Sequence, residues 1–104
     1  MVEKNDEIND KVHQYIDILK KKYRILRVYI YGSFAKGTNH KWSDIDLAII
    51  SPDFSDDTLS DRLMLMKLGV AIDDRIEPHP FSLNRFDVTD PLVYEICKNG
   101  LQIV

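Results

Sequence analysis

The chain has 104 residues, enough for a single domain with a modest hydrophobic core, and residues 1–104 are expected to form that one domain. Its 44% apolar and 30% charged content, with both signs mixed along the sequence, is typical of a globular fold and excludes a disordered chain. The net charge of −3 argues against stable nucleic-acid binding, and a single cysteine, Cys97, excludes an internal disulfide framework and is expected to be a core thiol.

The first half of the chain predicts a helix followed by two strands. An amphipathic helix is indicated by apolar residues at three-to-four spacing, namely Ile8, Val12, Ile16 and Leu19. The segment 24–31 is rich in β-branched and aromatic residues and stops at Gly32, which predicts a strand that runs into a tight turn. A short helical turn over 34–36, a polar loop over 38–42 and a strand over 44–50 should follow.

The second half predicts two further helices and a third strand. A helix over 59–70 carries apolar residues on nearly all sides, which favours a contact with a partner or a second copy. A strand over 73–82 contains Pro78 and Pro80, which cannot donate to a ladder, so it should lie at a sheet edge. The chain should close with a helix over 90–100, which buries Leu92, Val93, Ile96 and Cys97, and a short strand over 101–104. This order predicts an α/β (α+β) domain with helices packed on a small mixed sheet.

No run of about 20 apolar residues is present, and the first ten residues lack the apolar core of a secretion signal. Neither a membrane span nor export is therefore expected. The predicted location is the cytoplasm.

Two aspartates stand in the second predicted strand. Asp44 and Asp46 are two residues apart, so they should point to the same face, roughly 6.5 Å apart along the strand. Two ionised carboxylates that converge repel each other unless a cation lies between them. Oxygen ligands without a cysteine or a histidine pair favour Mg²⁺ or Mn²⁺ over zinc.

A turn suited to phosphate precedes these carboxylates. Gly32 allows the backbone to approach a ligand closely, and Ser33 offers a hydroxyl at the start of a helical turn. Glu77, in the third predicted strand, is the natural third carboxylate and should share a face with Arg75 and His79. Three carboxylates are enough to hold two metal ions about 3.5–4 Å apart, which is the arrangement that activates a hydroxyl and stabilises a leaving phosphate.

The motif resembles a known family. Gly32-Ser33, ten residues, and then Asp44-Ile45-Asp46 are similar to the signature of the DNA polymerase β-like nucleotidyltransferases, and in particular of the minimal nucleotidyltransferases of prokaryotes. The resemblance covers nearly the whole chain and implies the nucleotidyltransferase fold. It also implies that Gly32 and Ser33 bind the β and γ phosphates of a nucleoside triphosphate and that Asp44 and Asp46 hold two Mg²⁺ ions. Glu77, where the family commonly has aspartate, would complete the metal site, with His79 or Asp73 as alternatives.

The resemblance further implies a reaction and a partner. Proteins of this kind transfer AMP from ATP to a hydroxyl, and many are antitoxins that modify a tyrosine of a helical ribonuclease toxin of the HEPN class. A homodimer or a hetero-oligomer with that toxin is expected. Two alternatives remain open at this point: transfer to a small-molecule hydroxyl such as that of an aminoglycoside, and a subunit that blocks its partner or senses nucleotide without making a product.

Overall fold

The computed structural model describes residues 3–37, 43–55 and 57–104, with the backbone alone for residues 3–6. The predicted 38–42 loop lies outside these residues. In chain order, the structure contains α1 (Glu3–Lys20), β1 (Arg27–Tyr31), α2 (Ser33–Lys36), β2 (Ile45–Ile50), α3 (Thr58–Val70), β3 (Ile76–Phe81), α4 (Pro91–Asn99) and β4 (Leu101–Gln102). Within the described part of the chain, no helix has the length and apolar character needed to cross a membrane.

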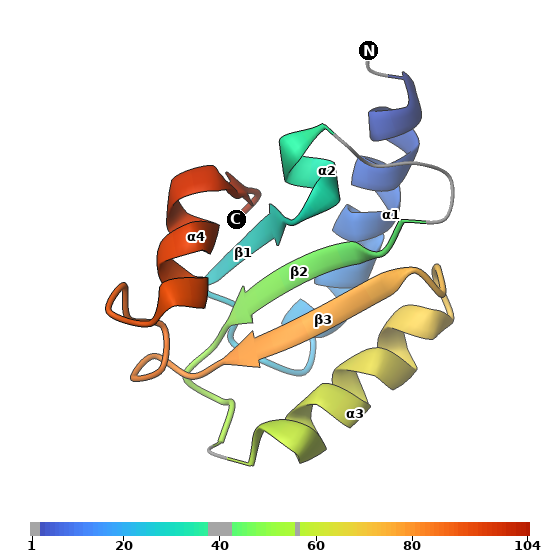
Figure 1. Cartoon of the computed structure of the whole chain (residues 1–104). Coiled ribbons are helices and arrows are strands. Elements are labelled where there is room, and N and C mark those ends of the chain that lie inside the picture. Colours follow the sequence, from blue (N-terminus) through green and yellow to red (C-terminus); the bar gives the residue numbers. More distant parts are fainter. Residues whose placement is uncertain (1–2, 38–42, 56) are drawn as a thin grey trace.

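The strands form one mixed sheet in the order β3-β2-β1-β4 (Figure 1). β1 is antiparallel to β2 and β4, whereas β2 and β3 are parallel and are connected through α3. The mixed sheet and the edge position of β3 were both predicted and are confirmed. Ile45 N donates to Arg75 O and Ser51 N donates to Phe81 O, so the odd-numbered residues of β3 face its partner strand. Pro78, like Pro80, therefore turns its missing donor toward the free edge.

One face of the sheet is covered by α1 and carries the main core (Figure 1). The strand residues that point to this face are the buried Val28, Ile30, Ile45, Leu47, Ile49 and Ile76. They pack against the predicted apolar stripe of α1 and against Leu65 of α3. Because every position on this face is apolar, polar chemistry has to lie on the other face.

The second face is apolar at one end and polar at the other. At the apolar end, Ile96 of α4 covers Tyr29, Ala48 and Ile50, and the Tyr29 ring stacks on Phe86 at 5.6 Å between centroids. At the polar end, the strand positions that point the same way carry Tyr31, Asp46, Glu77 and His79. Tyr31 packs against the cluster that contains Ile96 of α4, while Asp46, Glu77 and His79 are half-buried.

Two expectations for α4 are wrong. The helix begins after the predicted N-cap Asp90, whose Oδ1 accepts from Leu92 N, and it ends at Gly100 as expected. Only Val93 and Ile96 are buried, however, whereas Leu92 and Cys97 are exposed. The helix lies over one end of the sheet, so a single strip of side chains one turn apart reaches the core.

β3 is shorter than predicted because Asp73 forms a turn before it. Asp73 Oδ1 accepts from Arg75 N and Nε, and Oδ2 accepts from Arg75 Nη2 at 2.8 Å and from Lys11 Nζ at 3.0 Å. The Asp73 side chain is only 6% exposed. These bonds connect α1 to the start of β3, and because they occupy both carboxylate oxygens, Asp73 is not available as the alternative metal ligand.

Asp73→Asn should lower the free energy of unfolding by about 2 kcal/mol, because it leaves the partly buried Arg75 and Lys11 donors without a charged acceptor. The Arg75 and Lys11 hydrogen bonds hold the pKa of Asp73 below its usual range. A depressed carboxyl pKa contributes stability above the unfolded pKa, near 3.9, and that contribution is lost as the pH falls below about 4. Urea unfolding at pH 7 and pH 3 should therefore show that the wild type loses more stability on acidification than the variant.

The matched control is Asp53→Asn, which removes an exposed ion pair with Arg24. It should change stability little at either pH, because solvent screens such pairs. An Asp73→Asn variant as stable as this control at pH 7 would contradict the assigned role.

Candidate active site

Three polar side chains lie in one row across the second face of the sheet. Register pairs Tyr31 at the end of β1 with Asp46 in β2, and Asp46 with Glu77 in β3. The first strand ends at this row, while β2 and β3 begin at it, so the row marks one end of the sheet. The predicted meeting of the Asp46 and Glu77 side chains on one face is present in the structure.

His79 completes a compact group with these two carboxylates. Its Nε2 lies 3.7 Å from Asp46 Oδ1 and 4.0 Å from Glu77 Oε1. One ligand atom from each of the three residues can be chosen so that all lie within 4.8 Å of one another. The Tyr31 ring lies beside this group, 5.7 Å from the His79 ring between centroids. The expectation that Glu77 shares its face with His79 is met, whereas Arg75 precedes the strand and pairs with Asp73.

The group carries electrostatic strain. Burial raises the pKa of Asp46, the neighbouring His79 lowers it, and the charges of Glu77 and Asp44 raise it further. The net pKa shift is upward, which means that the ionised carboxylate is disfavoured at this position. Burial and the nearby Arg62 lower the pKa of His79, and the carboxylates only partly offset that effect. The imidazole is therefore neutral at pH 7 and has a nitrogen lone pair available as ligand or proton acceptor.

Asp44 stands at the rim of the group. It immediately precedes β2, is exposed, and acts on Asp46 through its charge. Among the described residues, the compact ligand group consists of Asp46, Glu77 and His79 and does not include Asp44. The predicted pair of aspartates thus has one partly buried member and one that faces solvent.

Gly32 lies against the Asp46 carboxylate. Its backbone has φ 74° and ψ −145°, a conformation that L residues with a side chain rarely adopt. A Cβ added at Gly32 would lie 2.5 Å from Asp46 Oδ2, closer than a real contact permits. The glycine is therefore required both by the backbone and by the neighbouring carboxylate.

Ser33 begins α2 directly after this turn. Lys36 N donates to Gly32 O, and α2 ends at Gly37, whose φ of 75° is left-handed and whose N–H donates to Ser33 O. The predicted helical turn and its terminator are confirmed. The turn that carries Ser33 is thereby placed beside the carboxylates.

Sequence reasoning missed Arg62. This residue lies on α3, and its Nη2 donates to Glu77 Oε1 at 2.9 Å. The available signal was its position three residues before Leu65 and seven before Gly69, which places it on the buried side of the helix. Arg62, and not Arg75, is the cation that balances Glu77.

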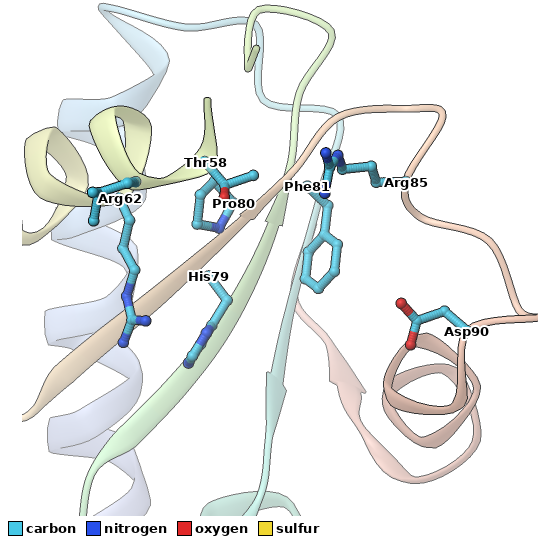
Figure 2. Close-up of a pocket in the computed structure, with 8 residues that line it drawn as sticks. Thr58, Arg62, His79, Pro80, Phe81, Arg85 and Asp90 are labelled. Atoms are coloured by element: carbon cyan, nitrogen blue, oxygen red, sulfur yellow. The ribbon is translucent and has the colours of Figure 1, made fainter. Parts of the chain in front are cut away.

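A pocket of about 480 Å³ opens beside the group, between α3, β3 and the start of α4 (Figure 2). Arg62 and His79 line it, and their side chains point in the same direction (Figure 2). The lining residues are Thr58, Leu59, Arg62, His79, Pro80, Phe81, Arg85 and Asp90. Because His79 belongs to both, the pocket is continuous with the carboxylate group.

The family model described as nucleotidyltransferase domain matches residues 12–99. This range includes the Gly32 turn, the carboxylates of the candidate site and strands β1, β2 and β3. The chain belongs to this family. The resemblance predicted from the Gly-Ser and Asp-Ile-Asp motifs is confirmed, as are the α+β nucleotidyltransferase fold and an enzyme of this kind.

Individual relatives of this nucleotidyltransferase give finer comparisons. Protein adenylyltransferase MntA of Shewanella oneidensis is 36% identical over 50 residues, which are 48% of this chain and 35% of MntA. The match thus spans about a third of MntA. A proposed protein adenylyltransferase of Methanocaldococcus jannaschii is 34% identical over 70 residues, 64% of this chain and 69% of that protein.

A solved structure is similar over most of the nucleotidyltransferase. One chain of a crystal structure of a toxin–antitoxin with AMP-PNP aligns with a TM-score of 0.63 at 26% identity. The alignment covers 89% of this chain and 69% of that chain. The shared architecture therefore extends well beyond the motif.

The donor set of the nucleotidyltransferase suits a divalent cation. Asp46 and Glu77 supply hard oxygen atoms of the kind that Mg²⁺ and Mn²⁺ prefer, and His79 adds a neutral nitrogen. A cation between them would offset the burial and the neighbouring negative charges that together raise the pKa of Asp46. The residues therefore fit the metal that the family resemblance implies.

Proposed function

We propose that this nucleotidyltransferase transfers AMP from ATP to a tyrosine hydroxyl on a partner protein in the cytoplasm, and that it requires Mg²⁺. The observation that supports the proposal best is the contact between the Gly32 turn and the Asp46 carboxylate. A triphosphate held by Gly32 and Ser33 would extend its α-phosphate toward Asp46 and Glu77. Two Mg²⁺ ions at Asp44, Asp46 and Glu77 would supply charge neutralisation on the phosphate oxygens and activation of the hydroxyl.

The residues of the chain have distinct roles in this reaction. The acceptor oxygen forms a bond to the α-phosphorus, the bond from that phosphorus to the β-bridging oxygen breaks, and pyrophosphate leaves. Gly32 and Ser33 bind the departing phosphates through backbone and hydroxyl groups. The acceptor proton passes to a carboxylate, for which Glu77 is placed on the side away from Gly32. Positioning and charge account for most of the expected acceleration.

The comparisons support a protein as the acceptor. MntA is named a protein adenylyltransferase, and the similar solved chain belongs to a toxin–antitoxin. We infer that this chain acts as an antitoxin that modifies a helical toxin of the HEPN class. The experiment is co-incubation with α-³²P-ATP, Mg²⁺ and the protein encoded next to it, with an aminoglycoside such as kanamycin as the competing acceptor. Label on the protein supports the proposal. Label on the drug alone would instead support transfer to a small-molecule hydroxyl.

An exposed apolar stripe on α3 supports a partner contact. Leu59, Leu63, Met66 and Val70 are 68%, 55%, 40% and 61% exposed. Their spacing of four, three and four residues places them on one side of the helix, away from the buried Leu65 and Gly69. Leu59 also lines the pocket, so a helix of the toxin that packs on the stripe would lie beside the catalytic group.

Leu63→Glu should weaken binding to the toxin about tenfold or more, because it places a charge in the apolar contact. The fold should be unchanged, since the side chain is exposed. Lys67→Glu, on a neighbouring side of the same helix, is the control and should have a smaller effect. Calorimetric titration of the two chains measures both, and equal affinities for the two variants would place the contact elsewhere.

A further inference from the structure

Arg62 forms an ion pair with Glu77, the third carboxylate predicted for the candidate site. Its Nη2 lies 2.9 Å from Glu77 Oε1, and the two side chains are 39% and 33% exposed. Within the described part of the chain, Arg62 Nε is shielded from solvent and has no hydrogen-bond acceptor. The guanidinium is thus held by Glu77 with only part of its hydrogen-bonding capacity used.

This position puts Arg62 in competition with a divalent cation. The positive charge adds to the burial that lowers the pKa of His79, and it opposes the burial that raises the pKa of Tyr31. A cation that already pairs with Glu77 repels a second one at the same carboxylate. For Glu77 to bind a metal ion with its full charge, Arg62 therefore has to pair with a different anion.

The pocket provides a place for that anion. Arg62 lines the pocket. Along β3 the pocket extends from His79 to Phe81, and therefore away from Glu77. The Gly32 turn lies on the other side of Asp46, next to the end of β1. In phosphoryl transfer the attacking and leaving oxygens lie roughly in line with the phosphorus. If pyrophosphate leaves toward Gly32, the acceptor approaches from the opposite side, which is the side of the pocket.

We propose that Arg62 is a positioning residue that exchanges Glu77 for a carboxylate side chain of the acceptor protein, bound in this pocket, and thereby releases Glu77 for the metal. The inference rests on the proposed function, since it assumes an acceptor on this side. An arginine fork matches a carboxylate with two parallel hydrogen bonds. The apolar walls formed by Leu59, Pro80 and Phe81 suit the carbon atoms of a peptide better than a free inorganic anion.

The test measures Mn²⁺ binding by calorimetry and by electron paramagnetic resonance, without nucleotide. Arg62→Gln should lower the Kd for Mn²⁺ about tenfold, because it removes the competing charge. Arg62→Lys keeps the charge and should remain near the wild-type Kd. Arg24→Gln, which removes an arginine from an exposed ion pair with Asp53, is the matched control and should also leave the Kd unchanged.

A peptide titration tests the ligand. Acetyl-Glu-Tyr-Glu-amide at millimolar concentration should lower the Kd for Mn²⁺ in the wild type and have no effect in Arg62→Gln. Acetyl-Gln-Tyr-Gln-amide, at the same ionic strength, should have no effect in either. If sulfate alone lowered the Kd for Mn²⁺ in the wild type as much as the Glu peptide does, the assignment of the pocket to a peptide carboxylate would be overturned.

Two results would overturn the exchange itself. One is a Kd for Mn²⁺ that stays the same or rises in a folded Arg62→Gln variant, with folding judged by thermal unfolding. The other is a Kd for Mn²⁺ in Arg62→Lys that is lowered as much as in Arg62→Gln, which would show that the positive charge of Arg62 is not the cause. Because these measurements use no ATP and no transfer step, they remain decisive even if AMP transfer to a protein is not found.

Discussion

Asp46→Asn should reduce AMP transfer to the partner protein by at least about a thousandfold. The substitution removes the negative charge from the most central ligand atom of the group, which lies between the Gly32 turn and the Glu77 and His79 side chains. A metal-assisted displacement that loses a carboxylate ligand would lose several kcal/mol of transition-state stabilisation. The initial rate of label transfer from α-³²P-ATP at saturating Mg²⁺ measures the effect.

The same variant should not be destabilised. A raised carboxyl pKa means that the ionised form costs stability at pH values above it, so the neutral asparagine should unfold at the same temperature or a slightly higher one. Asp53→Asn, far from the site and paired with Arg24, is the control and should retain full transfer. A folded Asp46→Asn protein that transfers AMP at a rate similar to this control would remove Asp46 from the reaction.

Gly32→Ala should cost about 3 kcal/mol or more of folding stability and should abolish transfer. Its backbone lies in a region that is close to exclusive to glycine, and the new Cβ would collide with Asp46 Oδ2. Relief of that collision has to move either the turn or the carboxylate. Both movements separate the proposed phosphate site from the proposed metal site.

Gly37→Ala is the matched control for this glycine. Its φ of 75° and ψ of 15° are left-handed helical, and a Cβ there would meet none of the described residues within 4 Å. The cost should be about 1 kcal/mol from backbone strain alone, with transfer retained. Urea unfolding and transfer rates should separate the two variants, and similar losses in both would show that the contact with Asp46 has no special importance.

The sequence predicted those parts of the site that are local in the chain. The Gly32 turn, the short α2 and its terminator Gly37 follow from backbone preferences of single residues, and each is confirmed. The alternation of Asp44 and Asp46 with apolar neighbours predicted a strand with one polar face. Local patterns were sufficient here because each depends on residues a few positions apart.

The remaining parts depend on contacts between distant segments. The parallel register that sets Glu77 opposite Asp46 is determined by the crossover through α3, for which no local pattern exists. Likewise, the pairing of Arg62 with Glu77 joins a helix to a strand 15 residues away. The exposure of Cys97 follows from how little of α4 reaches the sheet. Such features come from packing and could not be derived from periodicity.

Glu77 shows both what local sequence patterns predict and what depends on contacts between distant segments. Glu77 was selected from its strand position, and the structure brings it into the group with Asp46. What the sequence did not indicate is that a cation already pairs with it and that a pocket adjoins that cation. A nucleotidyltransferase whose third carboxylate is paired in this way would gain its full metal site only in the presence of its acceptor.

The most direct test of the account compares the two ends of the triphosphate. The chain is incubated with its partner protein and Mg²⁺, once with α-³²P-ATP and once with γ-³²P-ATP, and the label on the partner is counted. We expect label from the α-phosphate, none from the γ-phosphate, and release of labelled pyrophosphate in the second reaction. Transfer of the γ-label, or no label from either nucleotide, would contradict a site built to bind the departing phosphates at Gly32 and the acceptor beyond Asp46.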